Sequence, residues 1–416
     1  MKIHIDPVIS SRIKQAWNGL TAAQQSQIAP LLARASQQAQ MVTNTGQPPA
    51  TPTNVQPHQL LLARSAINGD QDQIVSQLEA GAVITVGSGG EIWGTGKYQQ
   101  LDPGWVEAGA VWLENLLKAR VPFVATPQVI NIPNSVRIAI AGDWGTGDWR
   151  TVANPAPSTD VARHMAFLRP DYTIHLGDTY YAGTADEEQH LMTALWPAGS
   201  QGSFALNSNH EMYSLAEGYF TQVLGHAKFA AQNGCGFFAL QNNDWVIVGL
   251  DTAYYAPEMK LYLDGSLYPA GGPEVQLDFL KAQIATGKKV VILTHHGGLS
   301  LDGKTPNTLW QQVTSAFPAG GQRAYWYWGH EHAAVVYEPR DDSNLLTRCC
   351  GHGGIPWGKA PILDNNAAVA WFENRSAGDP DVPQRVMNGF VMLGFEGPTL
   401  KETFYDETGG EAVSLG

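Results

Sequence analysis

The stretch VRIAIAGDWG, residues 136–145, is an apolar run that ends in a polar, glycine-containing loop. A nearly continuous apolar run of this length is typical of a strand that is covered on both faces. The same pattern returns in DYTIHLGD at 171–178, GSFALNSNHE at 202–211, KKVVILTHH at 288–296 and RAYWYWGHEH at 323–332. Helix-like runs lie between these segments, so the sequence predicts an α/β core with additional strands in the C-terminal part.

Each of these predicted strands ends in side chains that can bind a metal ion. They are Asp143, Asp178 with Tyr181, Asn209, His295, and His330 with His332. Any one of them alone is explained more simply as a turn, cap or core residue. Turn, cap or core roles do not explain why such residues recur at the same end of successive strands. That end is where open α/β sheets bind ligands.

The combined donor set predicts which metals the site would take. Carboxylate, amide and phenolate oxygens together with imidazole nitrogens suit Fe, Zn or Mn, and the set is too rich in nitrogen for a calcium cage. Two neighbouring ions need a ligand that spans both, which a carboxylate can do. An HxH pair on a strand sends both side chains to one face, so His330 and His332 are each expected to serve one of two neighbouring ions.

The ordered motifs GDWG (142–145), GDTYY (177–181), NHE (209–211), THH (294–296) and GHEH (329–332) resemble a known pattern. It is that of the calcineurin-like metallophosphoesterases, and within them of the purple acid phosphatases. The resemblance covers residues 136–335, about half of the chain. It implies a two-sheet α/β/β/α sandwich with two metal ions at one edge, Fe(III) and a divalent Fe, Zn or Mn. Ser208, Ile292 and Gly297 depart from the pattern, which has Gly, Val and Pro there.

The resemblance also implies a role for each ligand. It places Asp143, Tyr181 and His332 at the first ion, Asn209, His295 and His330 at the second, and Asp178 between the two. Tyr181 is the discriminating residue, since a phenolate at this position favours ferric iron. His295 is preferred over His296 because the ligand of the family comes first in this stretch.

The implied activity is hydrolysis of a small phosphate ester, with phosphomonoesters as the leading expectation. Two bridged cations lower the pKa of a coordinated water and neutralise charge at phosphorus, so a hydroxide between them would attack in line with the leaving oxygen. His210 directly follows a predicted ligand and is the candidate general acid, with Glu211 as a candidate to orient it. Four further residues near the motifs are weaker candidates for contacts with the substrate: Arg150, Tyr213, His296 and His352.

Two other functions stay open at this stage. One is a phosphodiesterase that acts on cyclic nucleotides or lipid head groups, which the motifs do not separate from a monoesterase. The other is a module that binds metal or phosphate without catalysis. A full set of ligands and a proton donor argue against that second alternative.

Residues 1–130 carry none of these motifs and are predicted to form a mainly helical accessory region, followed by a catalytic domain over 131–416. Apolar spacing across residues 9–41, and in QDQIVSQLEAG (71–81) and WVEAGAVWLENLLKARV (105–121), indicates helices. The Pro- and Thr-rich stretch near 42–58 predicts a linker.

Composition limits the partners of the protein. Hydrophobic residues make up 44% of the 416 residues and the formal net charge is −13, so a sizeable core is expected and nucleic acid is not expected as a partner. Three cysteines, two of them adjacent, give no disulfide framework. The chain begins without the pattern of a signal peptide and has no apolar run of about 20 residues, so it is predicted to be cytoplasmic and without a membrane span. The oligomeric state is left open.

Overall fold

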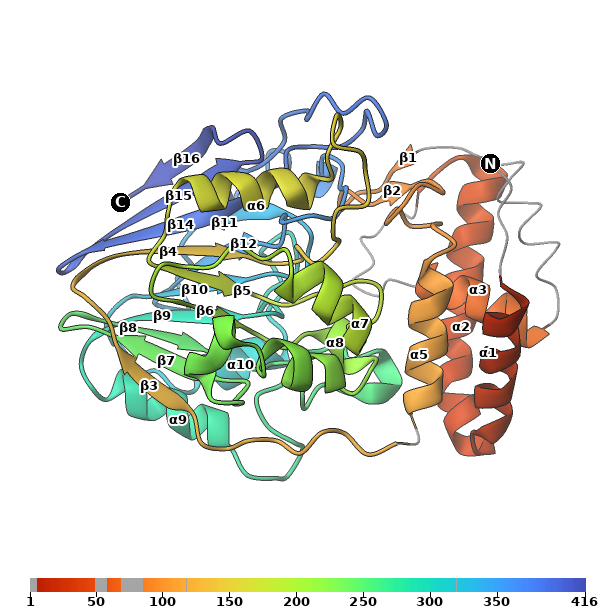
Figure 1. The fold of residues 1–416 in the computed structure, drawn as a ribbon, viewed down its shortest axis with the longest axis horizontal. Coiled ribbons are helices and arrows are strands. Elements are labelled where there is room, and N and C mark those ends of the chain that lie inside the picture. Colours follow the sequence, from red (N-terminus) through yellow and green to blue (C-terminus); the bar gives the residue numbers. More distant parts are fainter. Residues whose placement is uncertain (1–5, 49–57, 69–84, 117, 319) are drawn as a thin grey trace.

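Two β-sheets form the body of the molecule, and a group of helices stands beside them (Figure 1). The computed structural model describes residues 6–48, 58–68, 85–116, 118–318 and 320–416. The strands of the six-stranded sheet are, in order across it, β16 (Glu411–Leu415), β15 (Thr399–Asp406), β14 (Gly389–Glu396), β4 (Ser135–Ala141), β5 (Tyr172–His175) and β6 (Gly202–Ala205). Those of the eight-stranded sheet are β13 (Val369–Phe372), β11 (Ala334–Tyr337), β12 (Leu345–Cys350), β10 (Ala324–Trp328), β9 (Lys289–Thr294), β8 (Trp245–Gly249), β7 (Phe238–Gln241) and β3 (Gln128–Asn131).

The strands predicted to carry the motifs all form, and they are divided between the two sheets. Strands β4, β5 and β6 run parallel to one another in the six-stranded sheet. Strands β9 and β10 run parallel in the eight-stranded sheet. Parallel neighbours end at the same edge of a sheet, so the polar loops that follow them are gathered at one edge of each sheet.

The sheets pack face to face, and helices cover their outer faces. The core between the sheets contains apolar side chains from both, among them Ile140, Phe204 and Leu293. Helices α9 (Val275–Ile284) and α10 (Thr308–Thr314) cover the outer face of the eight-stranded sheet, and α6 (Pro157–Phe167) lies along the six-stranded sheet (Figure 1). The predicted two-sheet α/β/β/α sandwich is confirmed.

A buried ion pair ties the inner faces of the two sheets together. Arg348 on β12 donates to both carboxylate oxygens of Glu402 on β15, at 2.8 Å and 3.1 Å. The hydroxyl of Tyr327 on β10 donates to the same carboxylate. A charge in such a place is tolerated because it is paired and hydrogen-bonded.

The N-terminal region is helical, as predicted. Its helices are α1 (Pro7–Gly19), α2 (Ala22–Thr45), α3 (His58–Asn68) and α5 (Trp105–Asn115), and a short hairpin of β1 (Thr85–Val86) and β2 (Ile92–Trp93) precedes α5. Helix α2 begins with a capping box between Thr21 and Gln24, which satisfies its first backbone N–H groups. It continues to Thr45, so the first residues of the predicted linker are helical. The rest of that linker from 49 to 57 and the predicted helix at 71–81 lie outside the described residues.

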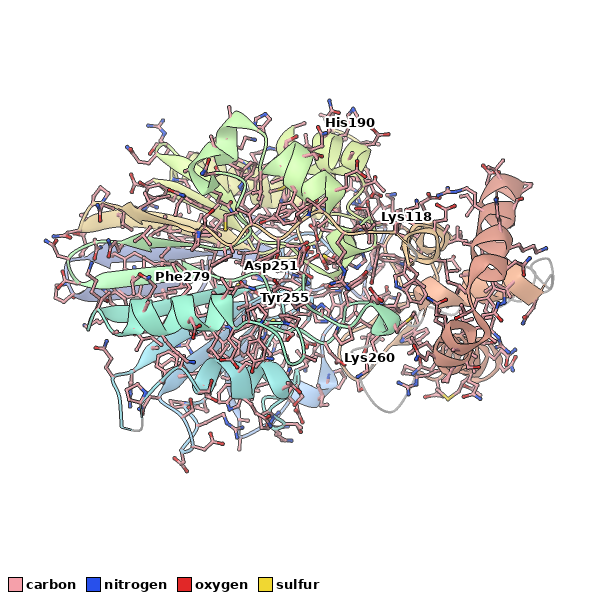
Figure 2. The ribbon with its side chains drawn as sticks, turned by 90° about the horizontal axis from the view of Figure 1, so that it is seen from below. Lys118, His190, Asp251, Tyr255, Lys260 and Phe279 are labelled. Carbon is pink, nitrogen blue, oxygen red and sulfur yellow. The ribbon has the colours of Figure 1, made fainter. Side chains whose placement is uncertain are left out.

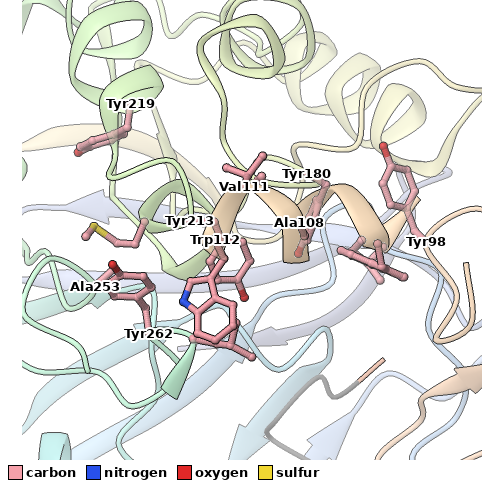
Figure 3. Packing of buried hydrophobic residues seen from close by; sticks show 14 of the residues in the cluster. Tyr98, Ala108, Val111, Trp112, Tyr180, Tyr213, Tyr219, Ala253 and Tyr262 are labelled. Carbon is pink, nitrogen blue, oxygen red and sulfur yellow. The ribbon is translucent and has the colours of Figure 1, made fainter. Parts of the chain in front are cut away.

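Helix α5 packs directly on the loops of the sheet body. Figure 3 shows Ala108 and Trp112 of this helix among Tyr180 and Tyr213, and one continuous apolar core includes all of them. The indole of Trp112 also donates to the backbone carbonyl of Glu258 at 3.0 Å. The helical region therefore shares its core with the body, and the predicted boundary at 130/131 falls inside β3, a strand of the eight-stranded sheet.

None of the helices formed by the described residues is both long and apolar enough to cross a membrane.

Candidate metal centre

The loops that follow the motif strands meet where the edges of the two sheets join. The backbone N–H of His330, after β10, donates to the carboxylate of Asp143, after β4, at 2.7 Å. The backbone N–H of Gly329 donates to the carbonyl of His295 at 3.0 Å, which joins the loops after β9 and β10. Residues from both sheets are thereby brought into one buried cluster.

Three donor atoms from three separate segments converge in the first part of this cluster, one of them from Asn209 at the start of the short helix α8 (Asn209–Met212). The amide Oδ1 of Asn209 lies 2.8 Å from Nε2 of His295 and 3.1 Å from Nδ1 of His330, and these two nitrogens are 3.2 Å apart. Nδ1 of His295 faces the carbonyl of Leu176 at 3.0 Å and therefore carries the proton. Its Nε2 then offers only a lone pair toward the Asn209 oxygen. Two electron donors facing each other at this distance fit a bound cation.

A second group of donors surrounds the hydroxyl of Tyr180. This oxygen lies 2.8 Å from Oδ2 of Asp178, 3.1 Å from Nε2 of His332 and 3.3 Å from Oδ1 of Asp143. Nε2 of His332 and Oδ1 of Asp143 are themselves 3.3 Å apart. Carboxylate, phenol and imidazole thus form a second set of ligands that suits a transition metal.

The neighbouring Tyr181, which the motif spacing predicted as the ligand, lies elsewhere. Its hydroxyl donates to the carboxylate of Asp102 at 2.5 Å, and Nζ of Lys97 lies 3.2 Å from it. Adjacent side chains on this loop point in different directions, and the sequence spacing does not show which one turns inward. The structure places Tyr180, and not Tyr181, beside Asp143 and His332.

Asp178 lies between the two groups of donors. Its Oδ1 is 3.4 Å from Nε2 of His295 in the first group, and its Oδ2 is the oxygen that contacts Tyr180 in the second. Each carboxylate oxygen is therefore directed toward one group. The bridging role expected of Asp178 stays a prediction, and this position is one from which a carboxylate could reach two ions.

The charges of the cluster favour cations. Burial, together with the nearby carboxylate of Asp178, raises the pKa of Asp143 well above its usual value. Burial also lowers the pKa of His295 and His332 to about 3 and that of His330 to about 4. All three imidazoles are therefore neutral near pH 7, which is the form that binds metals.

The backbone at the cluster adopts conformations that are uncommon for residues other than glycine. The φ angles are 57° at Asp143, 77° at Asp178, 68° at His330 and 48° at His332. Left-handed conformations at non-glycine residues cost free energy and are concentrated at functional sites. Their occurrence at four of the donor residues indicates that these loops are shaped by the site.

His296 is held by the protein through both ring nitrogens. Nδ1 lies 2.9 Å from the hydroxyl of Thr252, and Nε2 lies 2.9 Å from the carbonyl of Tyr262. His296 thus has no nitrogen to offer a metal without breaking these bonds, which favours His295 as the ligand.

His210, the candidate general acid, is completely buried beside the cluster. Its Nδ1 lies 2.7 Å from the backbone carbonyl of Tyr181 and so carries a proton, while its Nε2 lies 3.8 Å from Oδ2 of Asp178. Nε2 therefore faces the donor atoms and is the atom that could exchange a proton with a ligand.

Glu211 has a structural environment. Its carboxylate accepts hydrogen bonds from the backbone N–H groups of Thr179, at 3.0 Å, and Asp178, at 3.3 Å, and contacts the hydroxyl of Ser208. These bonds hold the loop that carries Asp178. The predicted role in orienting His210 stays a prediction, and a role in holding this loop is the one that the contacts support.

The other candidates for substrate contacts lie inside the protein. Arg150 donates to Asp379 at 2.8 Å. The hydroxyl of Tyr213 accepts from Nδ2 of Asn209 at 3.2 Å, which turns Oδ1 of that amide toward the histidines. His352 is buried against Phe404.

A cavity of about 590 Å³ opens beside the first donor group. His330 and His296 line it, together with apolar side chains such as Leu263 and Tyr268 and charged ones such as Asp264. Figure 2 shows Tyr255 within the sheet body and Lys260, another lining residue, on the side that faces the N-terminal helices. This volume is in the range of sites that bind small organic molecules.

Comparison with known proteins gives only distant likenesses. No protein-family profile and no curated protein matches the sequence. Among solved structures, GAP50, the anchor in the inner membrane complex of Plasmodium, aligns at 14% identity over 68% of this chain and 88% of its own, with a TM-score of 0.44. A purple acid phosphatase from yellow lupin (Lupinus luteus) seeds aligns at 15% identity over 68% of this chain and 54% of its own, with a TM-score of 0.49. A dimetal phosphatase from Danio rerio aligns at 12% identity over 67% of this chain and 98% of its own, with a TM-score of 0.40.

Two of these three are phosphatases. At such identities and TM-scores the alignments assign neither a family nor an activity to this chain. Its function has to be inferred from the geometry of the metal centre.

Proposed function

We propose that this chain is a hydrolase of phosphoric esters that uses two metal ions and prefers phosphomonoesters. The observation that carries the proposal is the position of Asp178, whose two carboxylate oxygens face two separate groups of donor atoms. Both groups combine carboxylate or amide oxygens with neutral imidazoles. His330 of the first group also lines a cavity of suitable size.

The two sites would be held by residues from both sheets. Asn209, His295 and His330 would hold one ion, Asp143, Tyr180 and His332 the other, and Asp178 both. A pair of such ions supplies a water of lowered pKa and positive charge for the phosphoryl oxygens. The phenol of Tyr180 suits Fe(III) at its site, with a divalent Fe, Zn or Mn at the other.

The protein itself supplies the proton for the leaving group. The Nδ1–H of His210 donates a hydrogen bond to the Tyr181 carbonyl, so Nε2 is directed at the centre and, in the imidazolium form, carries the proton that is given up. Such a donor contributes a factor of about 10²–10⁴ to a reaction rate. The hydrolysis then forms one P–O bond from water and breaks the ester P–O bond, and the leaving oxygen takes a proton from Nε2.

The cavity supports a substrate whose alcohol part offers both apolar and polar surface. Tyr268 and Leu263 line it together with polar and charged side chains such as Lys260, Asp264 and Gln312. His330, which lines the cavity, is a candidate metal ligand, so the phosphate group would bind at that end of the cavity.

Metal content and hydrolysis, measured on the same samples, test the proposal. The purified protein should contain two equivalents of metal and hydrolyse phosphomonoesters, and His295→Ala should lose both metal and activity. His190→Ala is the matched control, since this histidine is exposed and hydrogen-bonds only within its own helical segment. A wild-type protein that holds two metals but hydrolyses no phosphate ester would favour the non-catalytic metal-binding alternative.

A phosphodiesterase is the second candidate function. The cavity of about 590 Å³ is the observation that favours it, because it leaves room for a second ester substituent on phosphorus. Rates on an aryl phosphate and on the corresponding diester separate the two functions. A diester rate higher than the monoester rate would replace the leading proposal.

A further inference from the structure

Residues 97–105 of the N-terminal region lie against the loop that carries Tyr180 and Tyr181. The rings of Tyr98 and Trp105 contact both tyrosines, with centroids 4.9–6.2 Å apart within this group. The ring of Trp105 also contacts His210, at 5.8 Å. A segment that the sequence showed only as accessory is therefore part of the wall around the candidate general acid.

Asp102 is the anchor of this contact. One of its carboxylate oxygens accepts from the hydroxyl of Tyr181 at 2.5 Å and from the backbone N–H of Tyr98 at 2.6 Å. The other accepts from the N–H of Gly104 at 2.8 Å, at the start of α5. A hydrogen bond to a charged and buried acceptor is among the stronger ones in a protein, so this bond fixes the Tyr181 side chain.

Tyr181 contacts His210 through its backbone, so a restraint on Tyr181 also restrains His210. The carbonyl of Tyr181 accepts the Nδ1 proton of His210 at 2.7 Å. On the opposite side, the backbone N–H of Tyr181 donates to Glu187. Tyr181 is thus held at its hydroxyl and at its backbone, and its carbonyl restrains the His210 ring together with the rings of Tyr180 and Tyr213 that pack on it.

Space around Tyr181 is restricted as well. A Cβ atom added at Gly104 would collide with the hydroxyl of Tyr181. Because of this close approach, the Tyr181 ring cannot move toward the start of α5.

We propose that Asp102 and Tyr181 are positioning residues that aim His210 at the leaving group, so that the N-terminal region completes the active site. The inference rests on the proposed function, because it gives His210 the role of proton donor. In the reaction, the ester P–O bond breaks, the leaving oxygen takes the Nε2 proton, and His210 regains a proton from solvent while the attacking water gives one up.

Tyr181→Phe is the decisive variant. It removes the hydrogen bond to Asp102, while the backbone N–H groups of Tyr98 and Gly104 still donate to that carboxylate. A proton donor matters for a poor leaving group such as an alkoxide and little for an activated one such as a nitrophenolate. We expect kcat on an alkyl phosphate to fall about tenfold with KM unchanged, a fraction of the full effect of a general acid. On a nitrophenyl phosphate, kcat should change less than about twofold. Asp102→Asn should show the same loss of kcat on the alkyl phosphate alone. It replaces Tyr181→Phe as the test if that variant folds poorly.

Tyr405→Phe is the matched control. The hydroxyl of Tyr405 also donates to a carboxylate, that of Glu411 at 3.4 Å, but this bond is exposed and joins β15 to the edge strand β16. This control should leave both substrates unaffected. A double variant of Tyr181→Phe with His210→Ala should be no slower on the alkyl ester than His210→Ala alone, since both changes act through one residue.

A readout without turnover completes the test. In the metal-free protein, the Nδ1 proton of His210 should give a slowly exchanging NMR signal in the wild type and a rapidly exchanging one in Tyr181→Phe. Equal losses on both substrates, additive effects in the double variant, or an unchanged NMR signal would overturn the inference. A metal-loaded wild type that hydrolyses neither ester would instead contradict the proposed function itself.

Discussion

Separate replacement of Tyr180 and Tyr181 by phenylalanine tests which of these adjacent tyrosines belongs to the metal centre. Motif spacing favours Tyr181, whereas the structure surrounds the hydroxyl of Tyr180 with Asp178 at 2.8 Å, His332 at 3.1 Å and Asp143 at 3.3 Å. The hydroxyl of Tyr181 contacts Asp102 instead. The two variants remove the same single atom and differ in the contacts that this atom makes.

The contacts set the expected magnitudes. Changing even a residue that only supports a metal ligand weakens affinity by about 10–100-fold. Loss of the Tyr180 oxygen removes a donor, so we expect affinity for one ion to fall at least about 100-fold, or about 2.7 kcal/mol. Loss of the Tyr181 oxygen breaks a bond to a charged acceptor, worth about 1.5–3 kcal/mol of folding stability, and leaves both donor groups intact.

The assay loads metal-free protein with iron and a divalent metal in the presence of a competing chelator. Metal content and the visible spectrum are then recorded for the wild type and both variants. A broad visible band that persists in Tyr181→Phe and disappears in Tyr180→Phe would establish Tyr180 as the phenolate. The reverse result would refute the geometric reasoning and restore the prediction from motif spacing. A colourless wild type with two equivalents of Zn or Mn would contradict the ferric assignment alone.

Three further predictions concern stability. Removal of metal leaves the buried carboxylates of Asp143 and Asp178 without cations, so the melting temperature should fall when a chelator is added and recover when metal is restored. An ion at a hundred times its Kd contributes about 2.7 kcal/mol to the free energy of unfolding. Equal melting curves with and without the chelator would contradict a metal centre. Glu402→Gln leaves the charge of Arg348 buried and unpaired and should destabilise the protein by about 3–5 kcal/mol in denaturant unfolding, whereas an apolar pair at both positions should be far milder. Trp112→Ala removes the indole that packs between α5 and the sheet body, and should lower the free energy of unfolding by about 3–5 kcal/mol. The measurement is the rate of proteolysis around α5, which should rise. An unchanged rate of cleavage would show that the contact contributes little.

Local sequence patterns were sufficient for the strands and for most of the donors. An apolar run followed by a polar loop is a local feature, and parallel strands bring their ends to one edge whatever the rest of the chain does. For this reason Asp178, Asn209, His295 and His330 could be predicted to lie together, and the structure brings their donor atoms within a few ångströms of one another.

The roles of other residues depended on contacts between distant parts of the chain. Arg150 stands next to a motif, but its partner Asp379 is far away in sequence, and the ion pair turns the guanidinium into the protein. The hydroxyl of Tyr213 faces the amide of Asn209 and not the cavity, which no local pattern indicates. The cavity itself is formed by loops whose sequence carries no motif.

The sequence by itself indicated the strands that carry the motifs, the polar loops that follow them and the chemistry of the metals that these side chains suit, because these follow from side-chain type and periodicity. Only the tertiary structure decided which of Tyr180 and Tyr181 faces the centre and that Asp102, from the N-terminal region, holds the other one. The physical reason is that the direction of a side chain on a loop is set by its hydrogen-bond partners and packing, and here those partners come from 79 residues away.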